Sequence, residues 1–235
     1  MKVVDKEQER IDFENSPAGK RKQWLGLLAA VVFFLIAAVL YRMFPNIEIG
    51  GGKPYVIVMD GLEITPGTTT VQDLADAGYA LTDMSGKVML NERGENGEIV
   101  YRYRNVYDLT AEAEARTLYS MLILVKEEEQ AAGISIINNG TSAIPLSQCI
   151  VSDIYIYSNY IDADKVTVEG TPLPQLTEEK LTELFGKQDR NYDNTIGWNK
   201  GKYYFDLGVE EDGTVKYIST SKTYPTDALD NYYNN

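Results

Sequence analysis

Residues 24–44 read WLGLLAAVVFFLIAAVLYRMF, a run of 21 residues in which Arg42 carries the only charge. As a helix, this run is about 31 Å long, which matches the roughly 30 Å hydrocarbon core of a bilayer. Trp24 and Tyr41 lie at its two ends, as interfacial aromatic residues do, and the long side chain of Arg42 reaches the headgroups. The run therefore predicts one transmembrane helix over residues 24–44.

The charges around this run predict its orientation. Lys20, Arg21 and Lys22 come directly before it, whereas Arg42 and Lys53 are the only basic residues close behind it. Cytoplasmic flanks are rich in Lys and Arg, so residues 1–23 are predicted to form a cytoplasmic tail. A cleaved signal peptide has a shorter apolar region and a small-x-small cleavage site, and no such site follows here. We expect a retained signal-anchor in the cell membrane, with the C-terminal part extracytoplasmic.

The charge of the exported part narrows the classes of partner. Residues 46–235 hold 15 basic and 30 acidic side chains, a net charge of −15. This balance argues against nucleic acid and anionic lipid, which bind through Lys and Arg. It fits a cationic partner or a divalent cation, although most acidic surfaces only keep a domain soluble. The single cysteine, Cys149, excludes an intramolecular disulfide and is expected in the core.

Residues 45–53, with Gly50-Gly51-Gly52, form a predicted linker, and a repeated pattern follows it. A strand over 55–58, a turn at Asp60-Gly61, a strand over 62–64 and a helix over 71–77 capped by Thr70 are expected. The same order returns about 110 residues later as a strand over 166–168, a turn at Glu169-Gly170 and a helix over 178–185 capped by Thr177. We predict an α+β fold with two tandem helix-on-antiparallel-sheet units, residues 54–161 and 162–222, and a C-terminal tail over 223–235.

Further strands are predicted over residues 99–106, 134–138 and 149–157, and a hairpin joins 202–207 to 215–220. Residues 110–131 are ambiguous. Their Ala and Glu content and the spacing of Ala111, Ala115, Leu118 and Leu122 favour a helix, whereas the run LILV at 122–125 before an acidic turn favours a hairpin.

Several of these residues together resemble a known kind of domain. The stretches are Asp60-Gly61, GTTTVQDL at 67–74, Ala77-Gly78-Tyr79, PLSQCI at 145–150, and Thr177 with Leu181, Phe185 and Gly186. They resemble an uncharacterised exported domain of single-pass proteins and lipoproteins from clostridia-like Gram-positive bacteria. Its architecture is similar to the beta-lactamase-inhibitory-protein fold, which is known for binding. The resemblance implies that residues 119–125 form a strand, and it transfers no catalytic residue.

The residue types limit the chemistry. No histidine is present, which excludes Ser-His-Asp and Cys-His catalysis and histidine-ligated zinc. We therefore predict no catalytic residue and no cofactor. A weak calcium candidate is Asp189, Asn191 and Asp193, because oxygen ligands at these spacings open a calcium loop. Lys200 stands where that loop needs a glutamate.

Tyrosine is abundant, with 17 copies, and alternating tyrosines on a sheet face are typical of a binding surface or of half-buried strands. The partner-binding candidates are Tyr155, Tyr157, Tyr203 and Tyr204, and Tyr160 is expected in the same strand as the first two. The sequence thus favours a non-catalytic, membrane-anchored binding protein of the cell envelope with a protein partner, and its span allows homo-oligomerisation. The alternatives are a carboxylate-based cell-wall hydrolase and a membrane-anchored immunity or inhibitor protein.

Overall fold

The computed structural model describes residues 52–93, 99–192, 194–225 and 229–234, and, nearer the N-terminus, Ser16, Pro17, Lys20, Trp24, Val31 and Val32. The chain forms two compact units, Met1–Gly50 and Gly51–Asn235. Within the described residues, no helix combines the length and the apolar character that crossing a membrane requires. Most of the predicted span over residues 24–44 lies outside the described residues, so the span stays a prediction.

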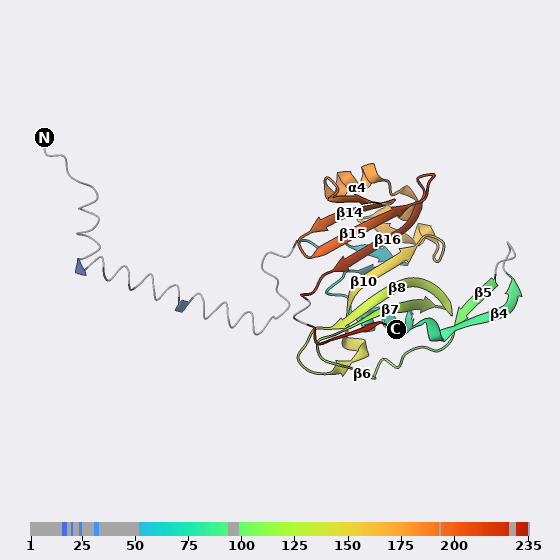
Figure 1. The fold of residues 1–235 in the computed structure, drawn as a ribbon, viewed down its shortest axis with the longest axis horizontal. Helices are drawn as coiled ribbons and strands as arrows, with labels where there is room; N and C mark the ends of the chain where they lie inside the picture. The colour runs from blue at the N-terminus through green and yellow to red at the C-terminus, as the bar shows by residue number, and fades with distance from the viewer. Residues whose placement is uncertain are drawn as a thin grey trace. The chain divides into compact units, whose positions relative to one another are not determined.

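The second unit is mostly β and is built on one large sheet (Figure 1). From one edge, the strands follow in the order β13 (Arg190–Tyr192), β14 (Thr195–Lys200), β15 (Tyr203–Val209), β16 (Val215–Lys222), β10 (Ile150–Tyr157), β8 (Glu129–Asn138) and β7 (Thr117–Lys126). The outer edge of β7 is shared by β3 (Ala80–Thr82) and β17 (Asn231–Asn234). All neighbours are antiparallel except β17, which runs parallel to β7.

A second, four-stranded sheet has the order β12 (Thr171–Pro172), β11 (Val166–Val168), β1 (Ile57–Met59) and β2 (Leu62–Ile64). It consists of two hairpins joined through the antiparallel pair β1–β11. Both hairpin turns have left-handed backbones, with φ of 52° and 84° at Asp60-Gly61 and of 47° and 79° at Glu169-Gly170. Each half of the predicted repeat therefore supplies one hairpin to this sheet.

Each hairpin leads into a short helix whose local sequence explains where it starts. In α3 (Val71–Asp76), Thr70 accepts from the Asp73 N–H, and Asp73 accepts from the Thr70 N–H, a complete capping box. In α4 (Glu178–Phe185), Thr177 accepts from the Lys180 N–H, and Gly186 ends the helix at φ 88°. Both predicted helices are confirmed, the first with one residue fewer.

Smaller elements complete the unit. The hairpin of β4 (Lys87–Arg93) and β5 (Ile99–Tyr103) projects from the large sheet (Figure 1), and β6 (Glu112–Ala113) pairs with β9 (Ile144–Pro145). The described part of the chain also contains four 3₁₀ turns: η1 (Met84–Gly86), η2 (Leu146–Gln148), η3 (Ala163–Lys165) and η4 (Leu173–Gln175).

The main core joins one face of the large sheet, the small sheet and both helices. Its centre is aromatic: Phe185 of α4 lies 4.6 Å from the ring of Tyr55 and 5.3 Å from that of Phe205, and Trp198 lies 6.1 Å from both phenylalanine rings. The Trp198 indole N–H donates to the Gly186 carbonyl at 2.9 Å, so the end of α4 is tied to β14. Cys149 is fully buried, as predicted, and burial raises the pKa of its thiol to about 12.

The structure corrects several expectations. Of the two alternatives for residues 110–131, the helix is excluded and the hairpin is confirmed, because β7 pairs with β8 and residues 119–125 are strand, as the resemblance implied. The α+β expectation holds only in the coarse sense of a mostly β unit with two short helices. Strand β14 was not predicted, and part of the expected C-terminal tail is β17. Tyr160 lies in the turn after β10 rather than in that strand.

Candidate functional site

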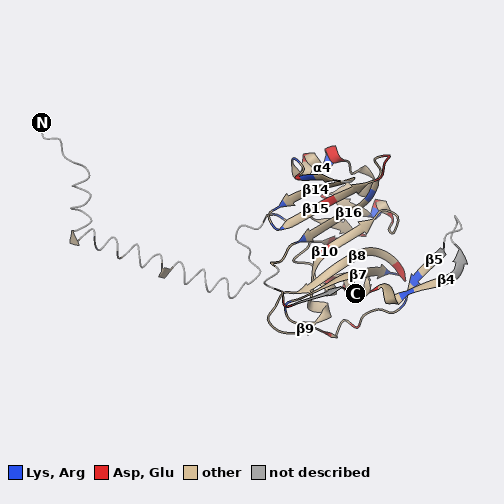
Figure 2. Ribbon diagram, in the orientation of Figure 1, with Lys and Arg blue, Asp and Glu red and all other residues tan. Residues whose placement is uncertain are grey.

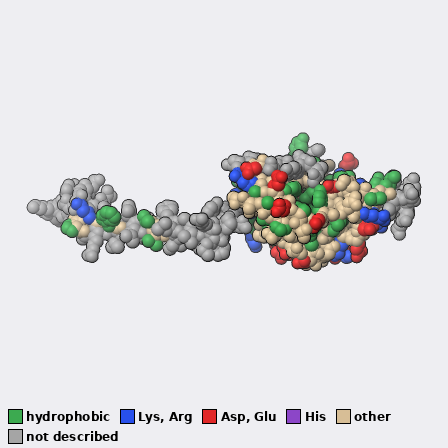
Figure 3. Space-filling view, turned by 90° about the horizontal axis from the view of Figure 1, so that it is seen from below, with side chains coloured by type: hydrophobic (Ala, Val, Ile, Leu, Met, Phe, Trp, Pro, Cys, Tyr) green, Lys and Arg blue, Asp and Glu red, His purple; other side chains and the backbone are tan. Residues whose placement is uncertain are grey.

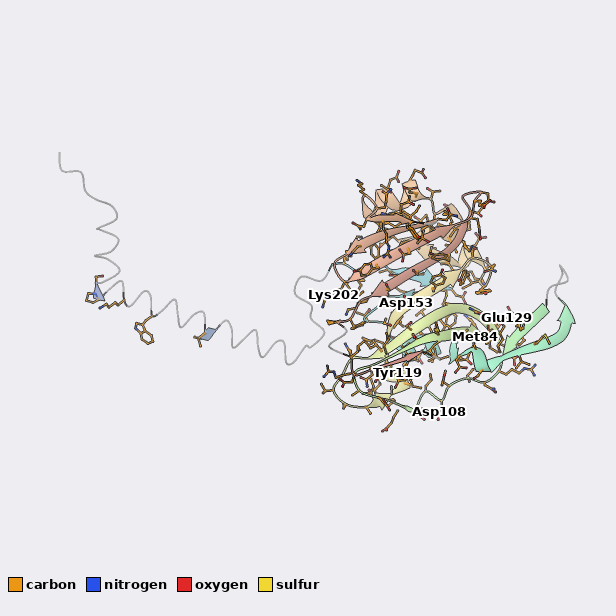
Figure 4. All side chains as sticks on the ribbon, viewed as in Figure 1. Met84, Asp108, Tyr119, Glu129, Asp153 and Lys202 are labelled. Carbon is orange, nitrogen blue, oxygen red and sulfur yellow. The ribbon has the colours of Figure 1, made fainter. Side chains whose placement is uncertain are left out.

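The two faces of the large sheet differ in what they contact. Along β10, Ile154 and Ile156 are fully buried in the main core, whereas the alternate residues Asp153, Tyr155 and Tyr157 are half-buried on the opposite face. Because side chains alternate along a strand, these three share that face, which we call the open face. Figure 4 labels Asp153 on β10, in the middle of the sheet.

Four tyrosines gather on the open face and form what we call the tyrosine cluster: Tyr155, Tyr157, Tyr160 and Tyr217. The ring of Tyr155 is stacked on Tyr217 at 4.4 Å and lies 4.8 Å from Tyr157. Tyr160 meets Tyr157 edge-on at 5.3 Å. Burial and a hydrogen bond with Tyr157 raise the pKa of Tyr155, so this phenol is neutral at physiological pH.

Glycine makes room for the cluster. Gly208 lies opposite Tyr217 in the β15–β16 pair, and a Cβ built on Gly208 would overlap the Tyr217 ring. The Tyr217 hydroxyl then reaches Thr195 of β14, 2.7 Å from its Oγ1. Glycine inside a strand commonly marks such a close approach, so the ring position of Tyr217 depends on Gly208.

The β4–β5 hairpin covers the β7 end of the open face. Tyr103 packs on Ile123 and Val125 of β7 and donates from its backbone N–H to the Glu128 carbonyl at 2.8 Å. Its hydroxyl donates to Gln130 at 2.9 Å. Figure 2 shows basic residues of this hairpin next to the acidic β7–β8 turn, where Arg102 pairs with Glu129 at 2.7 Å and Arg104 with Glu128 at 3.4 Å.

A groove of about 510 Å³ lies on the open face between the tyrosine cluster and the start of this hairpin. Its floor includes Gly133 and Ser135 of β8, and Met84 and Met121 line it from the β7 side. These two methionines are 60% and 65% exposed, so flexible apolar side chains border the groove. Met121 lies at the β7 bulge with φ 59°, a conformation that is strained for a non-glycine residue and is often found at functional sites.

Asp153 is the acid of the groove. It pairs across the sheet with Ser135 on one side and Ser221 on the other. Burial, and then the negative charge of Asp206, raise the pKa of its carboxyl to about 6. Asp206 is itself held by Arg190, which donates to both of its oxygens at 2.6 and 2.7 Å. Among the described residues, no ion pair or hydrogen bond compensates the Asp153 carboxylate.

A second, polar hollow of about 370 Å³ lies near Asp60, Tyr79 and Lys126. Lys126 forms an ion pair with Asp60, and Lys165 lies 4.0 Å from the other Asp60 oxygen. Asp60, one of four acids that line this hollow, is therefore compensated by lysines, unlike Asp153. The groove is therefore the stronger candidate for a ligand site.

The predicted partner-binding tyrosines separate into three places. Tyr155 and Tyr157 lie together at the groove. Tyr204 is on the open face of β15, with the Arg190 guanidinium 5.5 Å from its ring and away from the groove lining. Tyr203 is 8% exposed and faces the main core, because neighbours in a strand point to opposite faces.

The calcium candidate is not assembled as a loop in the described part of the chain. Asp189 accepts from the Asn199 N–H at 2.6 Å, and Asn191 pairs with Ile196 in the β13–β14 ladder. Asp193 lies outside the described residues. Within the residues described, no group of three or more Asp, Glu or Cys side chains is arranged to hold a metal ion.

Sequence reasoning missed Asp153, Tyr217 and Met121. The signal for Asp153 was present, because the segment IVSDIYIY at 150–157 places it on the same face as Tyr155 and Tyr157. Tyr217 joins them only through the β10–β16 pairing, which local pattern does not contain. No protein-family model, curated protein or solved structure matches this chain.

Proposed function

We propose that this protein is a non-catalytic binding protein of the bacterial cell envelope, anchored by residues 24–44, that holds a partner protein in the groove. The observation that carries the proposal is the half-buried tyrosine cluster beside a groove of about 510 Å³ on the open face. Tyrosine-rich concave surfaces are typical of protein interfaces, because each ring offers a large apolar area with a polar end.

The anchor rests on the apolar run and its basic flank. Of this run, the structure describes Trp24, Val31 and Val32, which have helical backbones and side chains that are 71%, 50% and 45% exposed. Apolar side chains without protein cover suit a lipid environment. With Lys20, Arg21 and Lys22 on the cytoplasmic side, the second unit is extracytoplasmic.

We further propose that this unit arose from two tandem helix-on-sheet units. The strand order β3–β7–β8–β10 in one half of the large sheet is mirrored by β13–β14–β15–β16 in the other. The two halves meet at the β10–β16 pair, with one capped helix following one hairpin in each. Tyr155 and Tyr217, from the two sides of this junction, are stacked, which places the tyrosine cluster where the halves join.

Binding fits the groove better than glycoside hydrolysis does. A carboxylate hydrolase needs two carboxyl groups about 5–9.5 Å apart, both facing the substrate. Asp153 is the acid that lines the groove. Asp206, whose negative charge acts on Asp153, accepts hydrogen bonds from Arg190 on both of its carboxylate oxygens. An immunity or inhibitor protein would need a broadly acidic concave face. The charged residues that line the groove are Asp153 and Lys87, so the groove is not broadly acidic, and the face of the protein seen in Figure 3 likewise has acidic, basic and apolar side chains interspersed.

The test is a pull-down from detergent-solubilised native membranes with the full-length chain, at low and at high salt. A Ser135→Arg variant fills the groove floor next to Asp153, and Asn199→Arg adds the same side chain at an exposed position on β14. We expect one stoichiometric partner with the wild type and with Asn199→Arg, and its loss with Ser135→Arg. A partner that all three proteins retain equally would refute the groove as the binding site.

A further inference from the structure

The groove combines three features that together define a ligand class. One wall is formed by Tyr155, Tyr157 and Tyr160 of the tyrosine cluster, the opposite border holds Met84 and Met121, and Asp153 is the acid that lines the groove. Aromatic faces carry partial negative charge and attract cations, while methionine side chains adapt to an aliphatic chain. This combination suits a long side chain that is apolar along its stem and positively charged at its tip.

The carboxylate of Asp153 has an uncompensated charge. Three other acids of this unit have a basic or backbone partner: Asp206 has Arg190, Asp60 has Lys126, and Asp73 has the Thr70 N–H. A half-buried carboxylate without such a partner destabilises the free protein. A bound cation would compensate the charge.

The charged and titratable groups around Asp153 leave room for this cation. Tyr155 and Tyr157 flank it on β10, and Asp206 approaches from β15 with its charge balanced by Arg190. Lys87, the basic residue that lines the groove, has its ammonium 4.0 Å from the Tyr101 ring centre. An anionic ligand would face Asp153 and the negative tyrosine faces, so it is disfavoured.

We infer that the groove binds a lysine or arginine side chain of the partner protein, with the cation at Asp153 and the aliphatic stem between the tyrosine cluster and the methionines. This inference rests on the proposed function and names the chemistry of its partner. It also agrees with the acidic balance of the chain, which has 35 acidic and 22 basic residues.

The experiment is an NMR titration of the full-length protein in nonionic detergent, labelled with ¹³C in its tyrosine rings. The probes are Nα-acetyl-lysine amide and Nα-acetyl-arginine amide, with Nα-acetyl-norleucine amide as the apolar control of similar length. Tyr→Phe variants assign the rings of Tyr157 and Tyr160, and Tyr192, which is 80% exposed on the distant β13, serves as the control ring.

We expect a cationic probe to shift the Tyr157 and Tyr160 resonances in a saturable way, with no shift at Tyr192 and none with the norleucine probe. Asp153→Asn should weaken binding about tenfold or more, since it removes a charged partner. The affinity should also fall as the pH drops through about 6 in the wild type and stay flat in Asp153→Asn, because a protonated carboxyl no longer attracts the cation.

Equal binding of the norleucine probe, or unchanged affinity in Asp153→Asn, would overturn the inference but leave the groove as a binding site. The absence of any shift at the cluster with both cationic probes would also overturn it. The proposed function is judged separately by the pull-down with Ser135→Arg, so the two failures are distinguishable.

Discussion

Replacing Asp153 by asparagine should make the protein more stable at neutral pH. The pKa of this carboxyl is raised from 3.8 to about 6, mainly by burial. Because the folded-state pKa lies above the unfolded one, the ionised form disfavours folding, and the penalty grows as pH rises from about 4 to above 6. A pKa raised by roughly two corresponds to a folding penalty of at most about 3 kcal/mol for the ionised carboxylate. Because solvent has partial access to the carboxyl, we expect a penalty of about 1–3 kcal/mol. Asparagine is nearly isosteric and carries no charge.

The assay is urea unfolding of the full-length protein in nonionic detergent, followed by the fluorescence of Trp198, which is 1% exposed. We expect Asp153→Asn to raise the free energy of unfolding by about 1–3 kcal/mol at pH 8 and by under about 1 kcal/mol at pH 4. Glu63→Gln, an exposed acid on β2, serves as the control and should show no such difference. A destabilised Asp153→Asn variant at pH 8, or an equal gain at both pH values, would refute the reasoning.

Three further substitutions, the first with a matched control, test the structure around the site and the first helix. Gly208→Ala should destabilise the protein by about 1–3 kcal/mol and displace the Tyr217 ring. The control, Gly133→Ala, should be nearly neutral, because its added Cβ would lie 3.7 Å from its nearest side-chain neighbour. Thermal unfolding and near-UV circular dichroism compare the two variants, and equal effects would contradict the packing around Gly208. Glu128→Gly should raise stability by under about 1 kcal/mol, because relief of the left-handed φ of 66° outweighs the loss of the exposed ion pair with Arg104; an unchanged or lower melting temperature would contradict this balance. Thr70→Ala should lower the free energy of unfolding by about 1 kcal/mol through loss of the capping box, measured by urea unfolding, and no loss would mean that the cap is not stabilising.

The features of this fold that the sequence predicts are those encoded by neighbouring residues. Thr70 and Thr177 each precede an acidic, amphipathic segment, so both helices were located from their caps. The turns at Asp60-Gly61 and Glu169-Gly170 similarly located the two hairpins of the small sheet. In each case the contacts that define the cap or turn join residues no more than four apart, so the local sequence pattern is enough to predict them.

The features that local pattern left open or missed depend on contacts between distant residues. The β7 segment TLYSMLILVK at 117–126 has apolar residues on both faces, since one face packs in the core and the other meets Tyr103. Its pattern therefore shows no clear period of two, and local pattern could not separate a helix from a strand. Strand β14 contains Gly197, which favours no strand by itself but leaves space for the Arg190–Asp206 ion pair.

The candidate site was half predictable for the same reason. Tyr155 and Tyr157 were identified from their alternation, and the same alternation includes Asp153. The expectation that Tyr203 belongs to a binding surface does not fit its burial in the main core. The sequence pair Tyr203-Tyr204 does not indicate which of the two adjacent residues faces the core. The cation that we infer for Asp153 belongs to another protein, so its position is not encoded in this chain.

The most direct test of the central claim, that a partner protein occupies the groove, is site-specific photocrosslinking in living cells. The photoreactive residue p-benzoylphenylalanine is placed at Tyr160, which lines the groove and is 44% exposed, and in a separate variant at Tyr192, the exposed aromatic residue on β13. Our account predicts a discrete crosslinked adduct from position 160 that disappears when Ser135→Arg is added, and no such adduct from position 192. No adduct from position 160, or the same adduct from both positions, would contradict it.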